Sequence, residues 1–395
     1  MSASEDGPKN SMRLPSDCRA DVVPLVVGRP NLGQRERFLA RVEDILDRRW
    51  LSNGGKYVQE FESRIADFLG VGHCIAMCNA TVGLEITIRA LGLRGEVIVP
   101  SFTFVATAHA LKWQEITPVF CDIDPATHNI DPLQVEKLIT PRTTGILAVH
   151  LWGRACDTEA LQAIADKHGL QLMYDASHAF GCTHRGKLIG GFGHAEVFSF
   201  HATKFLNTLE GGVVTTNDPV LADKARQMKN FGFTYYDQVD RLGINGKMNE
   251  ISAAMGLTNL EAIDEFVAAN RRNYEAYREE LRELPGLELL SYDDRNQHNY
   301  QYIVVAVDQE KTLVSRDDIV TELHQHDILA RRYFYPGCHR LEPYRSEQPD
   351  AGLRLPETER LAACLISLPT GSTVERADIS RVCGVLRRVL TDGKR

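Results

Sequence analysis

A single lysine lies where an apolar run meets a pair of glycines in the stretch SFHATKFLNTLEGG, residues 199–212. An amine at such a turn can attack a carbonyl group, accept a proton or bind a phosphate. A phosphate-binding P-loop has its glycines before the lysine, whereas here they follow Lys204, so that motif is excluded. The alternative to a chemical role is an ordinary solvated lysine in a turn.

Other side chains that can bind a ligand follow apolar runs elsewhere in the chain. They are Ala80 and Thr81 after the run 74–78, Phe104 after 96–100, Asp175 and His178 after 170–174, and Ser199 and His201 at the end of 197–201. In parallel α/β sheets, ligands bind beyond the carboxyl ends of the strands. These residues are therefore expected to converge on the same edge of a sheet as Lys204.

Together these groups match what pyridoxal phosphate (PLP) requires of a protein. Its phosphate needs amide and hydroxyl donors, which a helix beginning near Thr81 and the hydroxyl of Ser199 can supply. Its ring needs a flat face, for which Phe104 is the candidate, and its pyridine nitrogen needs a carboxylate, for which Asp175 is the candidate. Lys204 is then the amine that bonds to the aldehyde.

Each of these residues taken alone has a structural alternative. Asp175 can be a helix N-cap, Phe104 a core residue and His178 a packed polar side chain, while Thr81 and Ser199 can be caps or satisfied hydroxyls. What favours the cofactor site is their order along the chain, in which a phosphate loop, an aromatic residue, an aspartate and a lysine follow one another.

The elements that must position these residues alternate along the chain. Two amphipathic helices flank the turn WLSNGGK, and seven apolar runs between 74 and 216 are separated mostly by helical patterns. This alternation predicts an α/β fold with a mainly parallel sheet covered by helices on both faces. A long helical stretch then begins near Asn249, followed by a half-buried strand over 299–308 and helices from about Arg316 and Glu375.

Three regions are predicted from these patterns: a loose tail over 1–22, a large α/β domain over 23–265 and a smaller α+β domain over 266–395. The formal net charge of −8 argues against a general nucleic-acid or membrane binder. The nine scattered cysteines indicate a reduced cytoplasmic protein without a zinc site, so no metal is expected.

The chain resembles the DegT/DnrJ/StrS-type nucleotide-sugar aminotransferases, a family of fold-type I PLP enzymes, from about Pro24 to the C-terminus. The most specific stretch is VFSFHATKFLNTLEGGVVTTND, and DASHAFG, PSFTFVAT, FCDIDP, VHLWG and NEISAAMGL follow the family's order as well. Ala80 stands where many relatives have glycine and Tyr174 where many have glutamate, but the backbone amides and Asp175 remain.

The resemblance implies a role for each matching position. Lys204 would bond covalently to the cofactor, Asp175 would face the pyridine nitrogen, and His178 would lie near the ring hydroxyl. Phe104 would stack on the ring, and the phosphate would be held by Ala80, Thr81 and Ser199, with Asn245 and Lys247 reaching in from the second subunit of a homodimer. Weaker candidates for substrate contacts are Ser52, Asn53, Tyr333, Tyr335 and His339, and for the last three a core or rim position is the alternative.

The resemblance also implies a reaction. An amino group would pass from L-glutamate to C-4 of a dTDP-4-keto-6-deoxyhexose, in the biosynthesis of antibiotic or surface sugars. Amination at C-3 of a 3-keto nucleotide sugar and a non-enzymatic regulatory relative are the alternatives. Some relatives are dehydratases with histidine in place of the lysine, so Lys204 favours transamination.

Overall fold

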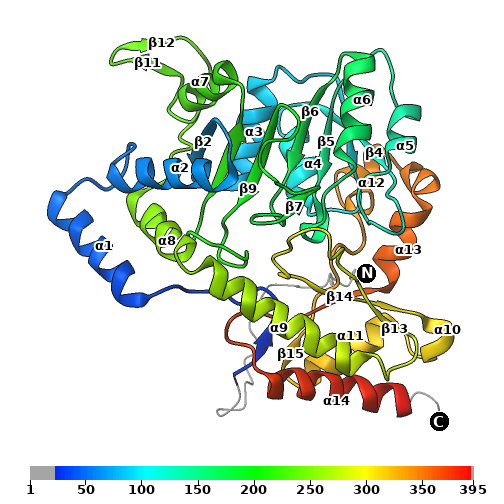
Figure 1. The fold of residues 1–395 in the computed structure, drawn as a ribbon. Helices are drawn as coiled ribbons and strands as arrows, with labels where there is room; N and C mark the ends of the chain where they lie inside the picture. Colours follow the sequence, from blue (N-terminus) through cyan, green and yellow to red (C-terminus); the bar gives the residue numbers. More distant parts are fainter. Residues whose placement is uncertain (1–22, 393–395) are drawn as a thin grey trace, which may run out of the picture.

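The computed structural model describes residues 23–392, so the predicted tail over 1–22 lies outside the described residues. The described chain forms a large α/β unit and a smaller unit beneath it (Figure 1). Within residues 23–392, no helix is both long and apolar enough to cross a membrane.

A seven-stranded sheet forms the centre of the large unit, in the order β2-β10-β9-β6-β5-β3-β4. Its strands are β2 (His73–Met77), β3 (Glu96–Pro100), β4 (Thr117–Cys121), β5 (Thr143–Val149), β6 (Gln171–Asp175), β9 (Ala195–Ser199) and β10 (Gly212–Thr216). Only β10 runs antiparallel to its two neighbours. The prediction of a mainly parallel sheet is therefore confirmed.

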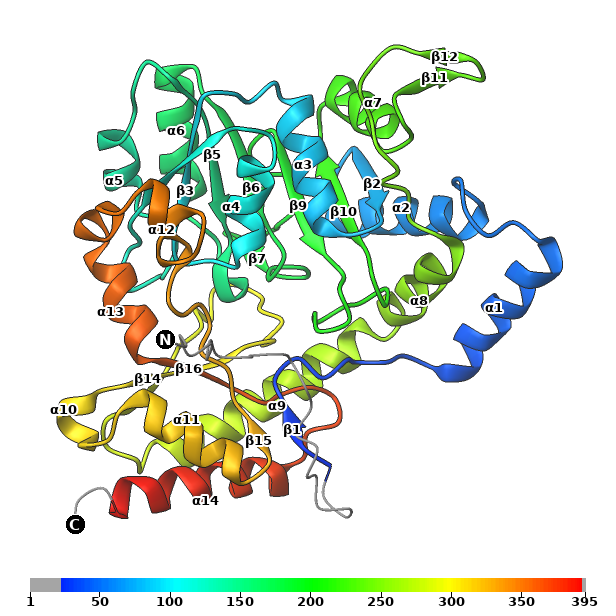
Figure 2. The ribbon, with the colours of Figure 1, turned by 180° about the vertical axis from the view of Figure 1, so that it is seen from behind.

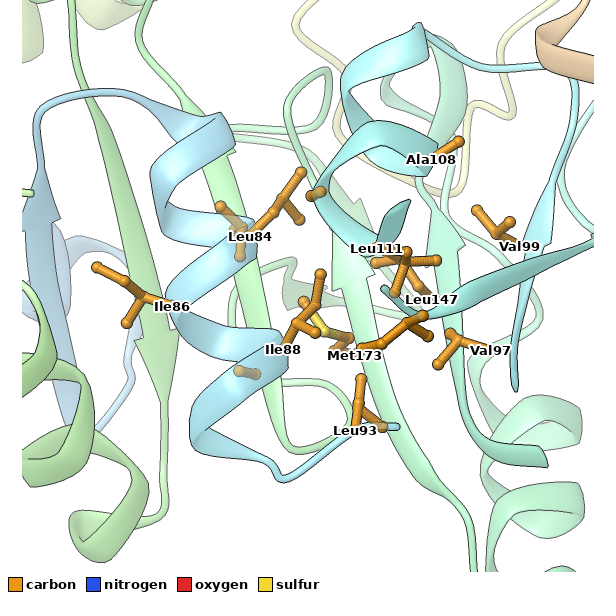
Figure 3. Close-up of a cluster of buried hydrophobic side chains, with 14 of the residues drawn as sticks. Leu84, Ile86, Ile88, Leu93, Val97, Val99, Ala108, Leu111, Leu147 and Met173 are labelled. Atoms are coloured by element: carbon orange, nitrogen blue, oxygen red, sulfur yellow. The ribbon is translucent and has the colours of Figure 1, made fainter. Parts of the chain in front are cut away.

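Helices cover both faces of this sheet, because successive residues of a strand point to opposite faces and both sets are apolar. Val97 and Val99 of β3 pack on one face with Leu147 and Met173, beneath α3 (Ala80–Ala90) and α4 (Val105–Lys112) (Figure 3). Ile98, between them in the sequence, belongs to a separate cluster with residues of α6 (Thr158–His168). The near-continuous apolar runs of the sequence thus follow from burial on two sides.

The other elements of the large unit surround this sheet. They are α1 (Arg35–Arg48), α2 (Lys56–Leu69), α5 (Pro132–Lys137), η1 (Leu151–Gly153), the pair β7 (Thr183–His184) and β8 (Lys187–Leu188), α7 (Pro219–Met228), the hairpin β11 (Phe233–Tyr235) and β12 (Gln238–Val239), and α8 (Glu250–Leu260). Figure 1 shows α1 and the hairpin extending away from the body of the molecule. Helices α1 and α2 flank the turn WLSNGGK as predicted.

The smaller unit contains a three-stranded antiparallel sheet in the order β13-β14-β16. Its elements are β13 (Leu287–Leu289), β14 (Ile303–Val307), α10 (Gln309–Thr312), α11 (Arg316–Gln325), β15 (Ile328–Leu329), η2 (Cys338–Arg340), α12 (Tyr344–Glu347), η3 (Ala351–Arg354), α13 (Pro356–Cys364), β16 (Leu365–Leu368) and α14 (Arg376–Asp392). The expected half-buried strand over 299–308 is shorter and mostly buried, because clusters pack on both faces of β14.

Two features connect the units. The long helical stretch beginning near Asn249 consists of α8 and α9 (Ile263–Leu281). The start of α9 packs in the large unit through Phe266, and its end packs in the small unit through Tyr277. The short strand β1 (Leu25–Val26) pairs with β15 of the small unit. The predicted domain limit at residue 265 falls within the first turn of α9 and stays a prediction.

Candidate active site

The loop that carries Lys204 joins two adjacent strands. It leaves β9 at Ser199 and returns to β10 at Gly212. Backbone bonds close it, from Phe200 N to Gly211 O (2.9 Å) and from Lys204 N to His201 O (2.8 Å). The next residue, Phe205, is buried in the core. The backbone of the lysine is therefore held at the carboxyl end of β9 by its neighbours on both sides.

The Lys204 amine differs from that of a solvated lysine. Burial lowers its pKa to about 8, because the ammonium ion loses water, and the Asp175 carboxylate opposes this shift only in part. A substantial fraction of the amine is therefore neutral at mildly alkaline pH, and a neutral amine can attack a carbonyl group or accept a proton. This contradicts the alternative of an ordinary solvated lysine.

Asp175 ends strand β6 and is 6% exposed. Its Oδ2 accepts a hydrogen bond from Thr107 Oγ1 of α4 (2.9 Å), and its Oδ1 accepts one from Ser177 N (3.0 Å). No helix begins at Asp175, so the alternative of a helix N-cap is wrong. Sequence reasoning missed Thr107, although it lies one helical turn after Phe104 and so shares a face with it.

His178 is buried and lies near the Lys204 amine. Its Nδ1 accepts a hydrogen bond from Trp152 N (3.3 Å), which leaves the proton of the neutral ring on Nε2. Burial, reinforced by the nearby Lys204, lowers the pKa of His178 well below its usual value. The ring of Phe334 stacks on it with centroids 5.7 Å apart. His178 is therefore a neutral imidazole with a donor available at Nε2.

The start of α3 and the end of β9 lie side by side. Asn79 caps α3 by accepting a hydrogen bond from Val82 N (2.8 Å), which leaves the amides of Ala80 and Thr81 without an intrahelical partner. Ser199 pairs with Gly212 across the sheet. A Cβ on Gly212 would lie 2.7 Å from Ala80 N, so only glycine permits this approach. Ser199 thus lies close to the two free amides, and together the three residues define a cradle suited to an anion.

Phe104 is the residue that precedes α4, and its side chain is 57% exposed. The alternative that it is a core residue is therefore wrong. Its backbone oxygen accepts a hydrogen bond from Thr107 N (3.1 Å), and Thr107 also contacts Asp175. The backbone of Phe104 and the carboxylate of Asp175 are thus connected through one residue, Thr107.

Asn245 and Lys247 lie beside the end of β2, where Met77 and Lys247 form an isolated bridge. The Lys247 amine donates to Asn230 Oδ1 (3.0 Å) and lies 4.6 Å from the ring centroid of Phe231. It lines a cavity of about 660 Å³ together with Asn53 and the aromatic residues of the β11–β12 hairpin. That Asn245 and Lys247 donate hydrogen bonds to the cofactor phosphate of a second subunit stays a prediction.

The predicted substrate contacts lie in different environments. Ser52 and Asn53 belong to the turn between α1 and α2, while Tyr333 and Tyr335 line a groove near Phe104. His339 is 2% exposed, its Nδ1 lies 2.7 Å from Ser101 Oγ, and its Nε2 lies 2.8 Å from Glu359 Oε1. Both ring nitrogens of His339 are therefore occupied, and we do not include it in the proposed substrate site.

The Lys204 pKa predicts how the cofactor-free protein captures PLP. The rate of covalent attachment should rise with pH and level off above about 8, because only the neutral amine attacks the aldehyde. Stopped-flow absorbance of the bound cofactor between pH 6.5 and 9.5 measures this rate. A midpoint near 10.5, the value for a solvated lysine, would contradict the desolvated amine.

The residues of this site fit PLP, each in the role predicted for it from the sequence. When bound, the cofactor supplies an aldehyde and a ring that accepts electrons. The Lys204 amine can bond to it and move a proton, the Asp175 carboxylate can keep the pyridine nitrogen protonated, and His178 Nε2 can donate to the ring oxygen. The fold and site together define a fold-type I PLP-dependent aminotransferase.

Comparison with known proteins identifies the family. The model of the DegT/DnrJ/EryC1/StrS aminotransferase family matches residues 33–387, and the chain belongs to this family. It is 35% identical to the dTDP-4-amino-4,6-dideoxy-D-glucose transaminase of Shigella dysenteriae, over 93% of this chain and 99% of the relative. It is also 35% identical to the GDP-perosamine synthase of Caulobacter vibrioides, over 94% of this chain and 100% of that relative.

A solved structure of DesI in the presence of its TDP-sugar product has a TM-score of 0.90 and 51% sequence identity, covering 94% of each chain. PseC of Helicobacter pylori, an aminotransferase, has a TM-score of 0.87 and 28% identity, covering 94% of this chain and 100% of that chain. The predictions of a PLP-dependent sugar aminotransferase and of its fold are therefore confirmed.

Proposed function

We propose that this enzyme transfers the amino group of L-glutamate to C-4 of a dTDP-4-keto-6-deoxyhexose, in the biosynthesis of a deoxyaminosugar. The observation that carries this proposal is the 51% identity, over 94% of both chains, to DesI, which was solved with its TDP-sugar product. The name of the Shigella dysenteriae relative supports position 4 of a dTDP-linked sugar. Retention of Lys204 supports transamination.

The residues of the site support each step that the protein must perform. The neutral fraction of the Lys204 amine could accept the proton from the substrate carbon that bears the amino group and later release it again. The Asp175 carboxylate, fixed by Thr107 and Ser177, stabilises positive charge on the ring nitrogen throughout. The cradle at Ala80, Thr81 and Ser199 anchors the phosphate so that the reacting atoms keep their orientation.

The cavity beside the α1–α2 turn supports a nucleotide-linked substrate. It combines Asn53 with the cations Arg226 and Lys247, with Lys229, whose amine lies 2.7 Å from Glu62 Oε1, and with the rings of Phe231, Phe233, Tyr235 and Tyr236. Aromatic faces suit a nucleobase and cations suit a diphosphate. We propose that the nucleoside diphosphate binds here.

The test is an assay with L-glutamate and purified nucleotide sugars that differ in one feature: dTDP or GDP as carrier, and a keto group at C-3 or C-4. NMR of the product locates the new amine. GDP belongs in the panel because of the GDP-perosamine synthase relative. Product from the dTDP-linked 4-keto sugar alone supports the proposal, and turnover of only the 3-keto sugar contradicts it.

A non-enzymatic regulatory relative is the other class to exclude. A yellow protein whose visible absorption disappears with borohydride and whose glutamate reaction produces pyridoxamine phosphate would exclude that class. A pure protein that stays colourless after incubation with PLP would contradict the enzyme proposal instead.

We propose a homodimer with composite sites. In the single chain, exposed apolar side chains gather on α1 and the turn that follows it: Leu39 (45%), Leu46 (58%), Trp50 (57%) and Leu51 (53%). Exposed patches of this kind mark association surfaces. A second copy covering this face would be consistent with donation of Asn245 and Lys247 to a neighbouring phosphate. A cytoplasmic location stays a proposal as well.

Complementation between two inactive variants tests the composite site. A Lys204→Ala subunit mixed with an Asn245→Ala/Lys247→Ala subunit should recover up to about a quarter of wild-type activity, because random pairing restores one intact site per heterodimer. Activity is measured after the subunits have exchanged, with mass spectrometry of the heterodimer as the control. No recovery despite proven exchange would contradict shared sites, provided that the double variant alone is impaired.

A further inference from the structure

The loop that follows Lys204 has a backbone conformation that its own residues do not favour. Residues 205–211 form bends and irregular backbone before β10, and Leu209 among them has a φ of 66°, in the left-handed region that favours glycine. The Leu209 side chain is 42% exposed, so its own burial does little to stabilise this conformation. A residue of this kind persists where the surrounding structure holds it, and such residues are concentrated at functional sites.

Three buried asparagines form a chain of side-chain amides along this loop. Asn259 of α8 donates through Nδ2 to Asn207 O (2.8 Å), and Asn207 Nδ2 donates to Asn31 O (2.8 Å). Asn31 Nδ2 in turn donates to the backbone oxygen of Phe205 (3.0 Å). The side chains are buried, with Asn31 3%, Asn207 1% and Asn259 0% exposed. The chain of amides therefore ends at the residue that directly follows Lys204.

The oxygens of the same three side chains are also occupied. They accept hydrogen bonds from three backbone N–H groups: Asn207 Oδ1 from Leu209 N (3.2 Å), Asn259 Oδ1 from Gly33 N (2.8 Å) and Asn31 Oδ1 from Ser372 N (2.8 Å). The first of these bonds holds the left-handed residue of the loop. Buried amides cost free energy unless they are hydrogen-bonded, and a fully connected buried network specifies one conformation. The network therefore fixes a single arrangement of the lysine loop.

The network joins parts of the chain that are far apart in the sequence. Figure 2 shows the segment between β1 and α1 passing close to the loop that joins β9 to β10. A Cβ on Gly28 would lie 2.9 Å from Thr203 Cβ, and a Cβ on Gly33 would lie 2.5 Å from Thr258 O. The segment thus packs against both the lysine loop and α8, and Ser372 adds a contact from the small unit.

We propose that Asn31, Asn207 and Asn259 are positioning residues, which hold the backbone after Lys204 so that its amine stays buried in the candidate active site. This inference rests on the proposed role of Lys204 and does not depend on which sugar is aminated. The charged and titratable groups that act on the amine are Asp175 and His178. The asparagines are neutral, so any change in the amine after their removal reports its position and hydration.

The test compares Asn31→Ala with the control Thr312→Val in the full chain. Thr312 is buried in α10 of the small unit, and within residues 23–392 its hydroxyl bonds only to residues 308–314. Both changes remove hydrogen bonds of a buried polar group, and both should lower the free energy of unfolding measured in urea. Only Asn31→Ala should alter the lysine.

The first measurement is the pH dependence of PLP attachment to the cofactor-free variants, followed by stopped-flow absorbance. In Asn31→Ala the midpoint should rise from about 8 by about one pH unit or more, because a loosened loop lets water reach the ammonium ion. Below the midpoint, each unit of this shift slows attachment by about tenfold, because it lowers the neutral fraction by that factor. Thr312→Val should keep the wild-type midpoint.

Two further measurements separate the position of the lysine from general damage to the site. Pyridoxamine phosphate has no aldehyde to bond to Lys204, so its affinity should stay within about threefold of the wild type in Asn31→Ala. The maximal rate of the single-turnover reaction of the holoenzyme with L-glutamate should fall by about 10- to 100-fold, as is typical of a misplaced reacting group. The glutamate concentration at half-maximal rate should change by less than about threefold.

An unchanged midpoint and an unchanged glutamate rate in a folded Asn31→Ala variant would overturn the proposal. An equal shift in Thr312→Val would overturn it as well, because the network would then give only general stability. If Asn31→Ala does not fold, Asn259→Ala gives the same test, since alanine suits a helix, and a wild-type midpoint there would count against the network.

Borohydride distinguishes failure of this inference from failure of the proposed site. Cofactor that is not fixed to the wild-type chain would contradict the proposed role of Lys204. Cofactor that is fixed to the wild type and to Asn31→Ala, with the same midpoint of attachment in both, would contradict the network alone.

Discussion

Replacing Lys204 by alanine is expected to lower turnover by about three orders of magnitude or more, because the change removes a covalent nucleophile and a base at once, and a positioned base alone contributes about 10² to 10⁴-fold. The variant should fold, since the backbone bonds that close the loop do not involve the Lys204 side chain. Steady-state assays with glutamate and the best keto sugar of the panel measure the loss.

A matched control is Lys187→Ala, which removes an exposed lysine from the short strand β8 of the same unit. It should keep wild-type activity, because its side chain is exposed and forms no hydrogen bond or ion pair with a site residue within residues 23–392. Borohydride should fix the cofactor to the wild type and to this control but not to Lys204→Ala. Near-wild-type turnover of Lys204→Ala would overturn the assignment of the lysine.

Asp175→Asn is expected to lower turnover by about a hundredfold or more while PLP binding changes little. An amide of the same shape can still bond to Thr107 and to the ring nitrogen, but it carries no negative charge to keep that nitrogen protonated. Single-turnover absorbance with L-glutamate measures the chemical step, and titration of the cofactor-free protein with PLP measures binding.

Thr107→Val provides a graded comparison for this aspartate. It removes the hydroxyl that donates to Asp175 Oδ2 and leaves the carboxylate charge in place. We therefore expect an intermediate loss of turnover, of about tenfold, as is typical when a supporting hydrogen bond is lost. An Asp175→Asn enzyme that reacts with glutamate at the wild-type rate would show that Asp175 has only a structural role.

Local patterns in the sequence predict the order of the elements and the chemistry proposed for the site. Strand β3 occupies the predicted run 96–100, and α11 begins at Arg316 as expected. Lys204 and Asp175 are candidates because each lies at or after the end of a buried strand, and the carboxyl ends of parallel strands meet at one edge. Such patterns are encoded by neighbouring residues, so a single sequence is enough to predict them.

Which distant residues meet depends on the packing of the whole fold. Thr107 contacts Asp175 across 68 positions, and β1 pairs with β15 of the small unit. The same packing buries His339 against Ser101, although its neighbours in the sequence suggested a substrate contact. It also pairs Arg332 with Asp317 and, within residues 23–392, leaves Arg331 without an ion pair, although the two arginines are adjacent. These outcomes depend on how two units pack together, and the chemical type and spacing of residues along the chain do not specify that geometry.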